Sequence, residues 1–161
     1  MRIGIVSDTH GNRLMVNLAL AELRQRGITT VLHCGDIDDP ETVELFRAFT
    51  THFVFGNCDY DKDALRAAMD ATGATLHDHF GNLELEGVKL AFTHGDDKHL
   101  MRDVERSGYY DFLFYGHTHQ AAEHRTGPTR VINPGALHRA RPKTFVVLDL
   151  GSREVESVTV E

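Results

Sequence analysis

The stretch RIGIVSDTHGN at residues 2–12 combines a strand-like run with a polar turn. Residues 2–7 are short and mostly apolar, which is typical of a buried strand, and Asp8 and His10 follow in the turn. Val16, Ala19, Leu20 and Leu23 then recur at helical spacing, with Gly27 as a stop signal. The chain therefore opens with a strand, a polar turn and a helix.

The same order recurs further along the first half. Residues 30–33 and 52–55 read as strands, and Asp36 and Asn57 follow them. Between them, Asp39 and Pro40 predict the start of a helix that buries Thr42, Leu45, Phe46 and Phe49. A further short helix places Leu65, Ala68 and Met69 on one face. Strands separated by helices of this length predict a parallel sheet.

The second half is richer in strands. Alternating residues around Glu86-Gly87 predict a hairpin whose second strand is 88–93. A helix near 98–107 and a strand at 110–115 follow, and the segments 129–133, 144–150 and 154–160 are rich in β-branched residues. We expect these last segments to form a mainly antiparallel second sheet. The predicted α/β fold is a four-layer αββα sandwich of two mixed β-sheets flanked by helices.

Composition excludes several classes of protein. The 161 residues are 41% hydrophobic and 25% charged, as expected for one globular domain. The net charge of −7 and the absence of a basic stripe argue against a nucleic-acid partner. No apolar run reaches the roughly 20 residues of a membrane span, and the N-terminal residues do not resemble a signal peptide. A cytoplasmic location is therefore expected, with no membrane partner.

Seven side chains of metal-ligand type follow five of the predicted strands. Ligands bind at the carboxyl ends of strands in such sheets, so these side chains should share one rim. Imidazole mixed with carboxylate and amide oxygens suits Mn, Fe, Co, Ni or Zn, and two ions sharing a carboxylate would use the whole set. The seven residues are Asp8, His10, Asp36, Asn57, His94, His117 and His119.

These residues lie in five ordered motifs, which together resemble the calcineurin-like metallophosphoesterase superfamily. The form Gly56-Asn57-Cys58-Asp59 and the later Asn133-Pro134-Gly135 are similar to its small YfcE-type phosphodiesterase branch. The resemblance runs from residue 1 to about residue 150, and it implies one metallophosphoesterase domain at 1–161. The motifs are Asp8-x-His10, Gly35-Asp36, Gly56-Asn57-x-Asp59, Thr93-His94-Gly95-Asp96 and Gly116-His117-Thr118-His119.

The resemblance also implies a mechanism. One metal would be held by Asp8, His10, Asp36 and His119, and the other by Asp36, Asn57, His94 and His117. The ions would be two divalent transition metals, with Mn the first choice and Ni, Fe, Zn and Co as alternatives. A hydroxide bridging them would attack a small-molecule phosphate ester or diester. Asp36, Asn57 and His94 are the expected catalytic residues. Relatives often self-associate, which allows a homo-oligomer.

Two departures and two alternatives accompany this interpretation. Cys58 stands where larger relatives carry a histidine that acts as general acid, and Ala136 stands where the family usually has serine. The retromer vacuolar-sorting subunit resembles this family with an impaired site, so a non-catalytic protein-interaction scaffold is the alternative function. A structural single-zinc site would leave several ligand groups unused. The complete ligand set favours the enzyme.

Other polar residues have simpler explanations. His33 is expected in the core or behind the ligands, and Cys34 is expected to pack; Asp59 and Asp96 are candidates to orient a histidine or pair with arginine. His99 and His138 stay undecided. His138, Arg139 and Arg141 could meet a substrate phosphate, although a solvated basic loop is the simpler interpretation. The histidines expected at the surface are His52, His77, His79 and His124.

Overall fold

A computed structural model describes residues 1–160; Glu161 lies outside this range. β1 (Arg2–Val6) leads through the polar turn into α1 (Arg13–Gln25), and β2 (Thr30–His33) pairs parallel with β1. The Asn12 side chain accepts a hydrogen bond from Met15 N and so caps α1. The strand-turn-helix unit predicted from residues 2–27 is confirmed, including the buried helix face.

The first sheet continues with α2 (Pro40–Leu45), β3 (Thr50–Phe53), α3 (Lys62–Thr72) and β4 (Thr75–Leu76). Asp39 caps α2 and Asp61 caps α3. β3 begins and ends two residues before the predicted 52–55, because its ladder with β2 ends at Phe53. Val54 and Phe55 are buried, yet Phe55 N donates to Asp78 O rather than to the ladder. The predicted range was therefore wrong by two residues, because an apolar residue can be buried without belonging to the strand.

The second sheet has the order β5-β6-β7-β9-β8. β6, β7 and β9 are parallel to one another, and the outer strands β5 and β8 pair antiparallel with them, so the sheet is mixed and not mainly antiparallel as expected. The predicted hairpin is confirmed, with Glu86 and Gly87 both at positive φ, as its two-residue turn requires. The strands are β5 (Phe80–Leu85), β6 (Val88–Thr93), β7 (Phe112–Phe114), β8 (Ala122–Thr126) and β9 (Thr129–Asn133).

The last two strands lie in the first sheet, which corrects the prediction for segments 144–150 and 154–160. β10 (Lys143–Asp149) pairs antiparallel with β1, and β11 (Val155–Val160) pairs with β10, giving the order β11-β10-β1-β2-β3-β4. Phe145 packs with the helices and Leu148 packs between the sheets. β10 is thus buried on both faces, and β-branched composition does not identify the sheet that such a strand joins.

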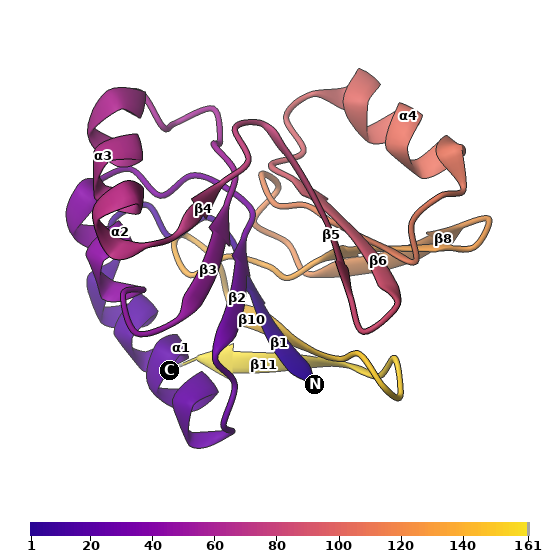
Figure 1. The fold of residues 1–161 in the computed structure, drawn as a ribbon, viewed down its shortest axis with the longest axis horizontal. Helices are drawn as coiled ribbons and strands as arrows, with labels where there is room; N and C mark the ends of the chain where they lie inside the picture. Colours follow the sequence, from indigo (N-terminus) through magenta and orange to yellow (C-terminus); the bar gives the residue numbers. More distant parts are fainter. Residues whose placement is uncertain (161) are drawn as a thin grey trace.

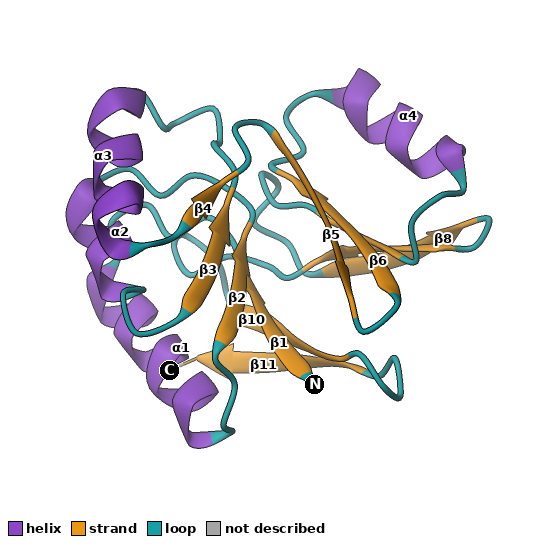
Figure 2. Cartoon of the chain, viewed as in Figure 1, coloured by secondary structure: helices purple, strands orange, loops and turns teal. Residues whose placement is uncertain are grey.

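The elements form four layers (Figures 1 and 2). α1, α2 and α3 cover the outer face of the first sheet, while α4 (Lys98–Ser107) covers the second. Ile5, Leu32, Phe92 and Phe114 are buried between the sheets. The predicted four-layer αββα sandwich is therefore confirmed. Within residues 1–160, no helix combines the length and hydrophobicity needed to cross a bilayer.

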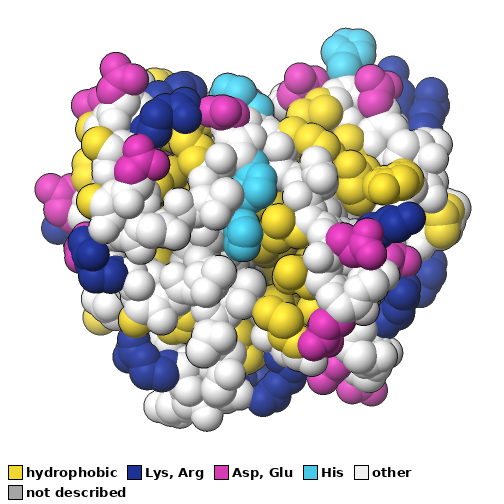
Figure 3. Space-filling model, in the orientation of Figure 1, with side chains coloured by type: hydrophobic (Ala, Val, Ile, Leu, Met, Phe, Trp, Pro, Cys, Tyr) yellow, Lys and Arg dark blue, Asp and Glu magenta, His cyan; other side chains and the backbone are white. Residues whose placement is uncertain are grey.

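Charged side chains are mixed on the surface seen in Figure 3. Lys and Arg side chains are interspersed with Asp and Glu around the edge of this face, and histidines lie near its middle and at its upper right. This face carries no broad basic patch of the kind that a nucleic-acid backbone would require.

Candidate metal centre

The seven predicted ligand residues meet at one edge of the sandwich. Asp8 and His10 follow β1, Asp36 follows β2, and Asn57 lies four residues beyond β3. From the second sheet, His94 follows β6, while His117 and His119 follow β7. The carboxyl ends of parallel strands in both sheets therefore deliver the side chains to a common place, as the sequence predicted.

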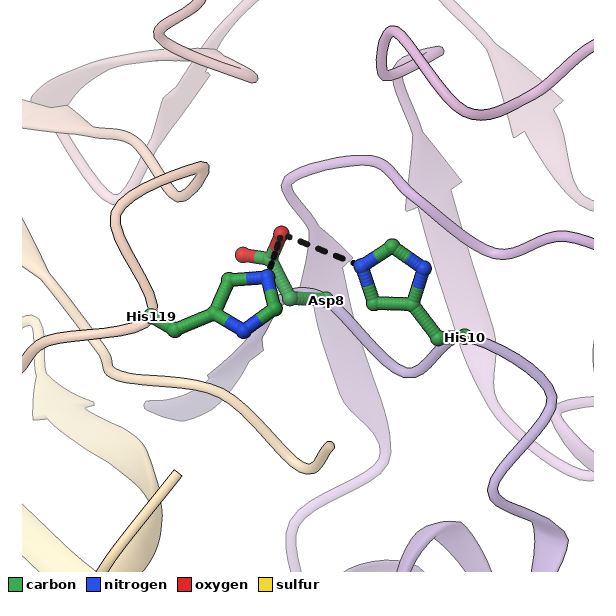
Figure 4. Close-up of side chains that lie close together, drawn as sticks. All are labelled: Asp8, His10 and His119. Carbon is green, nitrogen blue, oxygen red and sulfur yellow. Dashed lines mark ion pairs between the residues drawn. The ribbon is translucent and has the colours of Figure 1, made fainter. Parts of the chain in front are cut away.

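One group of side chains lies around Asp8. Figure 4 shows the rings of His10 and His119 converging on its carboxylate. Asp8 Oδ1 lies 3.2 Å from His119 Nε2 and 3.7 Å from His10 Nε2. Two imidazoles from different sheets thus present nitrogens to one carboxylate oxygen.

A second group lies around Asn57 and His94. Asn57 Oδ1 lies 2.9 Å from His94 Nε2 and 3.2 Å from His117 Nδ1. Asp36 contacts both groups, because its Oδ2 lies 3.2 Å from His94 Nε2 and 3.3 Å from His10 Nε2. The site therefore has two lobes that share the Asp36 carboxylate.

Hydrogen bonds hold the loops that carry these groups. Asp8 Oδ2 accepts from Ser7 Oγ at 2.6 Å and from His117 N at 3.0 Å, which joins the loops after β1 and β7. His94 Nδ1 lies 2.8 Å from Cys34 O and donates to it. That bond leaves Nε2 of a neutral His94 free to act as a ligand.

Asp59 holds the loop after β2 in place. The sequence predicted instead that it would orient a histidine or pair with an arginine. Its buried carboxylate accepts hydrogen bonds from four backbone N–H groups, at distances of 2.7 to 3.0 Å. The Asp59 carboxylate thus fixes the backbone of the turn that carries Asp36. Asp96, the other predicted partner, is exposed. The four donors are Asp36 N, Ile37 N, Asp38 N and Gly56 N.

Five ligand residues have left-handed backbone conformations. Such a φ is unfavourable for a residue with a Cβ and costs about 1–2 kcal/mol. Strain of this kind gathers at functional sites. Nearby, a Cβ on Gly56 would lie 2.1 Å from Asp36 Oδ1, so only glycine fits beside this carboxylate. The φ values are 52° for Asp8, 40° for His10, 59° for Asp36, 70° for His117 and 60° for His119.

Electrostatics follow from this crowding. Burial lowers the pKa of His94, but Asp36 and Asp8 outweigh it and raise that pKa to about 9. Burial raises the pKa of Asp36, but His94 outweighs it and lowers that pKa to about 2. Without an ion, the pair is therefore imidazolium and carboxylate. His33 differs, since burial lowers its pKa to about 3 and keeps it neutral in the core, as predicted.

The arrangement fits divalent metal ions. Asp8 Oδ1 and His10 Nε2 are buried and have no hydrogen-bond partner, although each lies beside other ligand atoms. Buried polar atoms are normally satisfied, so two unsatisfied ones at the centre of a ligand cluster fit a positively charged partner such as a metal ion. Carboxylate oxygen and imidazole nitrogen are the donors that divalent transition metals accept.

Asp38 and Tyr60 were not singled out from the sequence, whereas Cys58 was noted there at the position of the general acid. Asp38 lies 3.2 Å from His10 Nδ1, and its signal was the acidic run that follows Asp36. Tyr60 is 83% exposed and lines the cavity over the site. The Cys58 sulfur lies near His10 and Asp36, and burial together with Asp36 raises the pKa of its thiol. Cys58 is thus a neutral thiol beside the cluster.

The remaining histidines divide into three groups. His79 and His124 are exposed, as predicted, and so is His99. His52 and His77 are half-buried with their ring nitrogens 3.0 Å apart, so the prediction of two surface residues was wrong. Both lie where β3 meets β4, and sequence spacing did not show that contact. His138 lines the cavity over the site.

Comparisons with known proteins agree with this geometry. The profile of the calcineurin-like phosphoesterase superfamily domain matches residues 1–153. Phosphodiesterase MJ0936 of Methanocaldococcus jannaschii is 28% identical over 166 aligned residues, which cover 100% of both chains. The family resemblance inferred from the five motifs is therefore confirmed.

Solved structures share the fold. One described as a novel archaeal phosphodiesterase has a TM-score of 0.91 at 27% identity and covers 99% of each chain. The phosphoesterase YfcE from E. coli has a TM-score of 0.70 at 21% identity, over 100% of both chains. Vps29 from Entamoeba histolytica with Zn²⁺ has a TM-score of 0.68 at 20% identity, over 99% of each. The last two show the shared fold alone.

Proposed function

The chain belongs to the calcineurin-like phosphoesterase superfamily, and from this membership we propose that it is a binuclear metal-dependent phosphodiesterase. One observation carries the proposal. The unsatisfied Asp8 Oδ1 and His10 Nε2 lie in a two-lobed cluster of carboxylates, imidazoles and an amide that share Asp36. A carboxylate common to two lobes is the arrangement that a two-metal site requires.

The ligand sets follow the lobes. Asp36 is the shared ligand, and we assign Mn as the first choice of metal, with Ni, Fe, Zn and Co as alternatives. Asp38 is the group that orients His10, and Cys34 O orients His94. The first ion would be held by Asp8, His10, Asp36 and His119, and the second by Asp36, Asn57, His94 and His117.

When bound, two divalent ions supply Lewis acidity at phosphoryl oxygens and lower the pKa of water toward neutrality. The chain's own residues set the protonation and the geometry. His94 keeps its Nδ1 proton on Cys34 O, so its Nε2 must lose a proton before it can bind an ion. Asn57 presents an uncharged amide oxygen between His94 and His117.

The substrate class follows from the missing proton donor. Cys58 occupies the position beside the site where a general-acid histidine would stand, and its raised pKa makes it a poor acid. Departure of the leaving group therefore depends on its own stability as an anion. Small-molecule phosphodiesters with good leaving groups are the substrates that this site would hydrolyse best.

A non-catalytic protein-interaction scaffold is the second candidate. The observation in its favour is the full-length fold similarity to Vps29. The complete set of seven ligand-type residues in this chain favours the enzyme, because five of them have left-handed backbone conformations and two buried ligand atoms of the first lobe have no hydrogen-bond partner. A protein that only binds other proteins would gain nothing from this strain.

The test is to load purified protein with Mn²⁺ and assay bis(4-nitrophenyl) phosphate. We expect about two ions per chain and turnover that requires both, since a two-metal mechanism needs both lobes filled. Loaded protein with two ions and no turnover on any aryl diester would support the scaffold instead.

A further inference from the structure

The cavity over the metal centre has one wall that contains none of the proposed ligands. The cavity measures about 560 Å³, and this wall is formed by His138 and Arg139. Among the lining residues, all within the described part of the chain, Arg139 is the one Lys or Arg side chain. The His138 ring lies 5.4 Å from the His10 ring, which places this wall directly beside the first lobe.

Arg139 has no counter-ion in the protein. Across residues 1–160, no carboxylate oxygen lies within 4.0 Å of its guanidinium. Six arginines have such a partner, namely Arg13, Arg26, Arg47, Arg66, Arg130 and Arg153. Other arginines of the described residues, Arg141 among them, also have none, so Arg139 is distinguished by its place on the wall of this cavity. An unpaired guanidinium beside a site of buried carboxylates is therefore available to an incoming anion.

The loop that carries Arg139 is anchored to the ligand loops. Asn133, the last residue of β9, donates through Nδ2 to Gly116 O and to Thr118 Oγ1, both at 3.0 Å, which ties the start of the loop to the turn that bears His117. Leu137 N donates to Ser7 O at 3.3 Å, next to Asp8. These hydrogen bonds fix the position of the wall relative to the loops that follow β1 and β7.

The loop is anchored as far as Leu137, the residue before His138. Leu137 is buried, and its carbonyl accepts from Asn12 Nδ2 at 3.0 Å. Arg139 then has a φ of 48°, an unfavourable conformation for arginine that turns the chain back after the anchored segment. The next arginine, Arg141, lines a different hollow, with Met15 and Lys143. Of the arginines considered from the sequence, only Arg139 faces the metal centre.

We propose that Arg139 is the phosphate-binding residue of this site and holds a non-bridging oxygen of the substrate phosphodiester. A phosphodiester anion has two such oxygens, so one can face the ligand wall while the other accepts hydrogen bonds from the guanidinium. Arginine is suited to this role because its planar fork donates two parallel hydrogen bonds to phosphate. This inference rests on the proposed phosphodiesterase function and names the residue that recognises its anionic substrate.

The test compares Arg139→Gln with Arg141→Gln, a matched control two residues away in the same loop. Both are loaded with Mn²⁺, and three quantities are measured: bound metal, the Kd for inorganic phosphate by calorimetry, and kcat/KM for bis(4-nitrophenyl) phosphate. We expect Arg139→Gln to weaken phosphate binding and lower kcat/KM by about 10- to 100-fold, the range for a charge-assisted hydrogen bond. Metal content should stay at the wild-type level, and Arg139→Lys should recover part of the loss.

Arg141→Gln should change each quantity by less than about twofold, since exposed substitutions have small effects. Equal phosphate affinity in the two glutamine variants would overturn the inference. The phosphate measurement also separates this inference from the proposed function. If the loaded wild type hydrolyses no diester, the function fails, while a selective loss of phosphate binding in Arg139→Gln still supports Arg139 as the anion site.

Discussion

Nε2 of His94 lies 3.2 Å from Oδ2 of Asp36, and this contact links the two sheets at the centre of the site. The pair is an ion pair in the protein without ions, and under the proposed function the same two side chains would be ligands when metal is bound. These two uses require different protonation of His94, since a protonated imidazole cannot bind a metal.

A pH dependence follows from that difference. The pKa of His94 is raised from 6.5 to about 9. Its contribution to stability without ions is therefore fully present below pH 6.5 and is lost as the pH rises through about 9. We expect the Tm of chelator-treated protein to fall over this window. With Mn²⁺ bound, His94 is already neutral, so the fall should vanish.

The comparison needs a matched substitution. His94→Gln should abolish the decline between pH 6.5 and 9 without ions, whereas His79→Gln, at an exposed position, should keep it. A wild-type Tm that stays level across this window in chelator would contradict the assignment of the charged pair.

Asp36→Asn should damage the site more than any change outside it. Asp36 contacts both lobes, so the amide weakens two sites at once. We expect bound Mn²⁺ to fall well below two per chain. Diesterase activity should drop by more than about 100-fold, which exceeds the loss of activity seen when a residue that only orients a metal ligand is replaced. Asp61→Asn is the control, because asparagine still caps α3. Equal metal content in the two variants would refute the shared-ligand role.

Asp59→Asn should destabilise the protein. An amide oxygen cannot accept all four backbone N–H bonds that the carboxylate receives, so buried donors lose their partners. The expected fall in the free energy of unfolding is about 2–5 kcal/mol, measured by urea denaturation. Asp63→Asn, at an exposed site on α3, should change it by less than about 0.5 kcal/mol. A fall below 1 kcal/mol for Asp59→Asn would exclude the anchoring role.

Cys58→His should shift substrate preference. The wild type should hydrolyse an aryl diester faster than an alkyl monoester, because no histidine protonates the leaving oxygen. A new imidazole should raise kcat/KM for the alkyl monoester by up to about 100-fold, within the range of general-acid catalysis, and leave the aryl diester nearly unchanged. Cys58→Ala controls for loss of the thiol. Faster alkyl monoester turnover by the wild type would show that another donor acts.

Much of this fold was predictable from local patterns. The spacing from Val16 to Leu23, the Asp39-Pro40 helix start and the Glu86-Gly87 turn each depend on neighbouring residues, and the structure confirms them. The location of β10 was not predictable in this way. Its pairing with β1 joins residues far apart in sequence, and a strand buried on both faces carries no pattern that names its neighbour.

For the candidate site, the ligand residues were predictable from the sequence and the contacts that support them were not. Strand ends predicted which seven side chains would meet, because parallel strands bring their carboxyl ends to one edge. The supporting contacts were harder to predict. Asp59 was expected to orient a histidine or to pair with an arginine, yet it accepts hydrogen bonds from backbone N–H groups. Every residue type except proline has such a group, so the sequence does not show which ones a carboxylate will contact. Arg139 lines the cavity over the site and Arg141 lines a different one, a distinction that the sequence of this loop did not show.

The position of β1 between β2 and β10 has a consequence for synthesis of the protein. A nascent chain has made Asp8, Asp36 and Asn57 long before the ribosome reaches residues 143–149, so the strand beneath Asp8 stays uncovered on one side until then. Contacts of such long sequence separation form slowly. Metal capture is therefore expected late, after release of most of the chain, and ribosome-arrested chains ending before residue 143 should retain no Mn²⁺ after gel filtration.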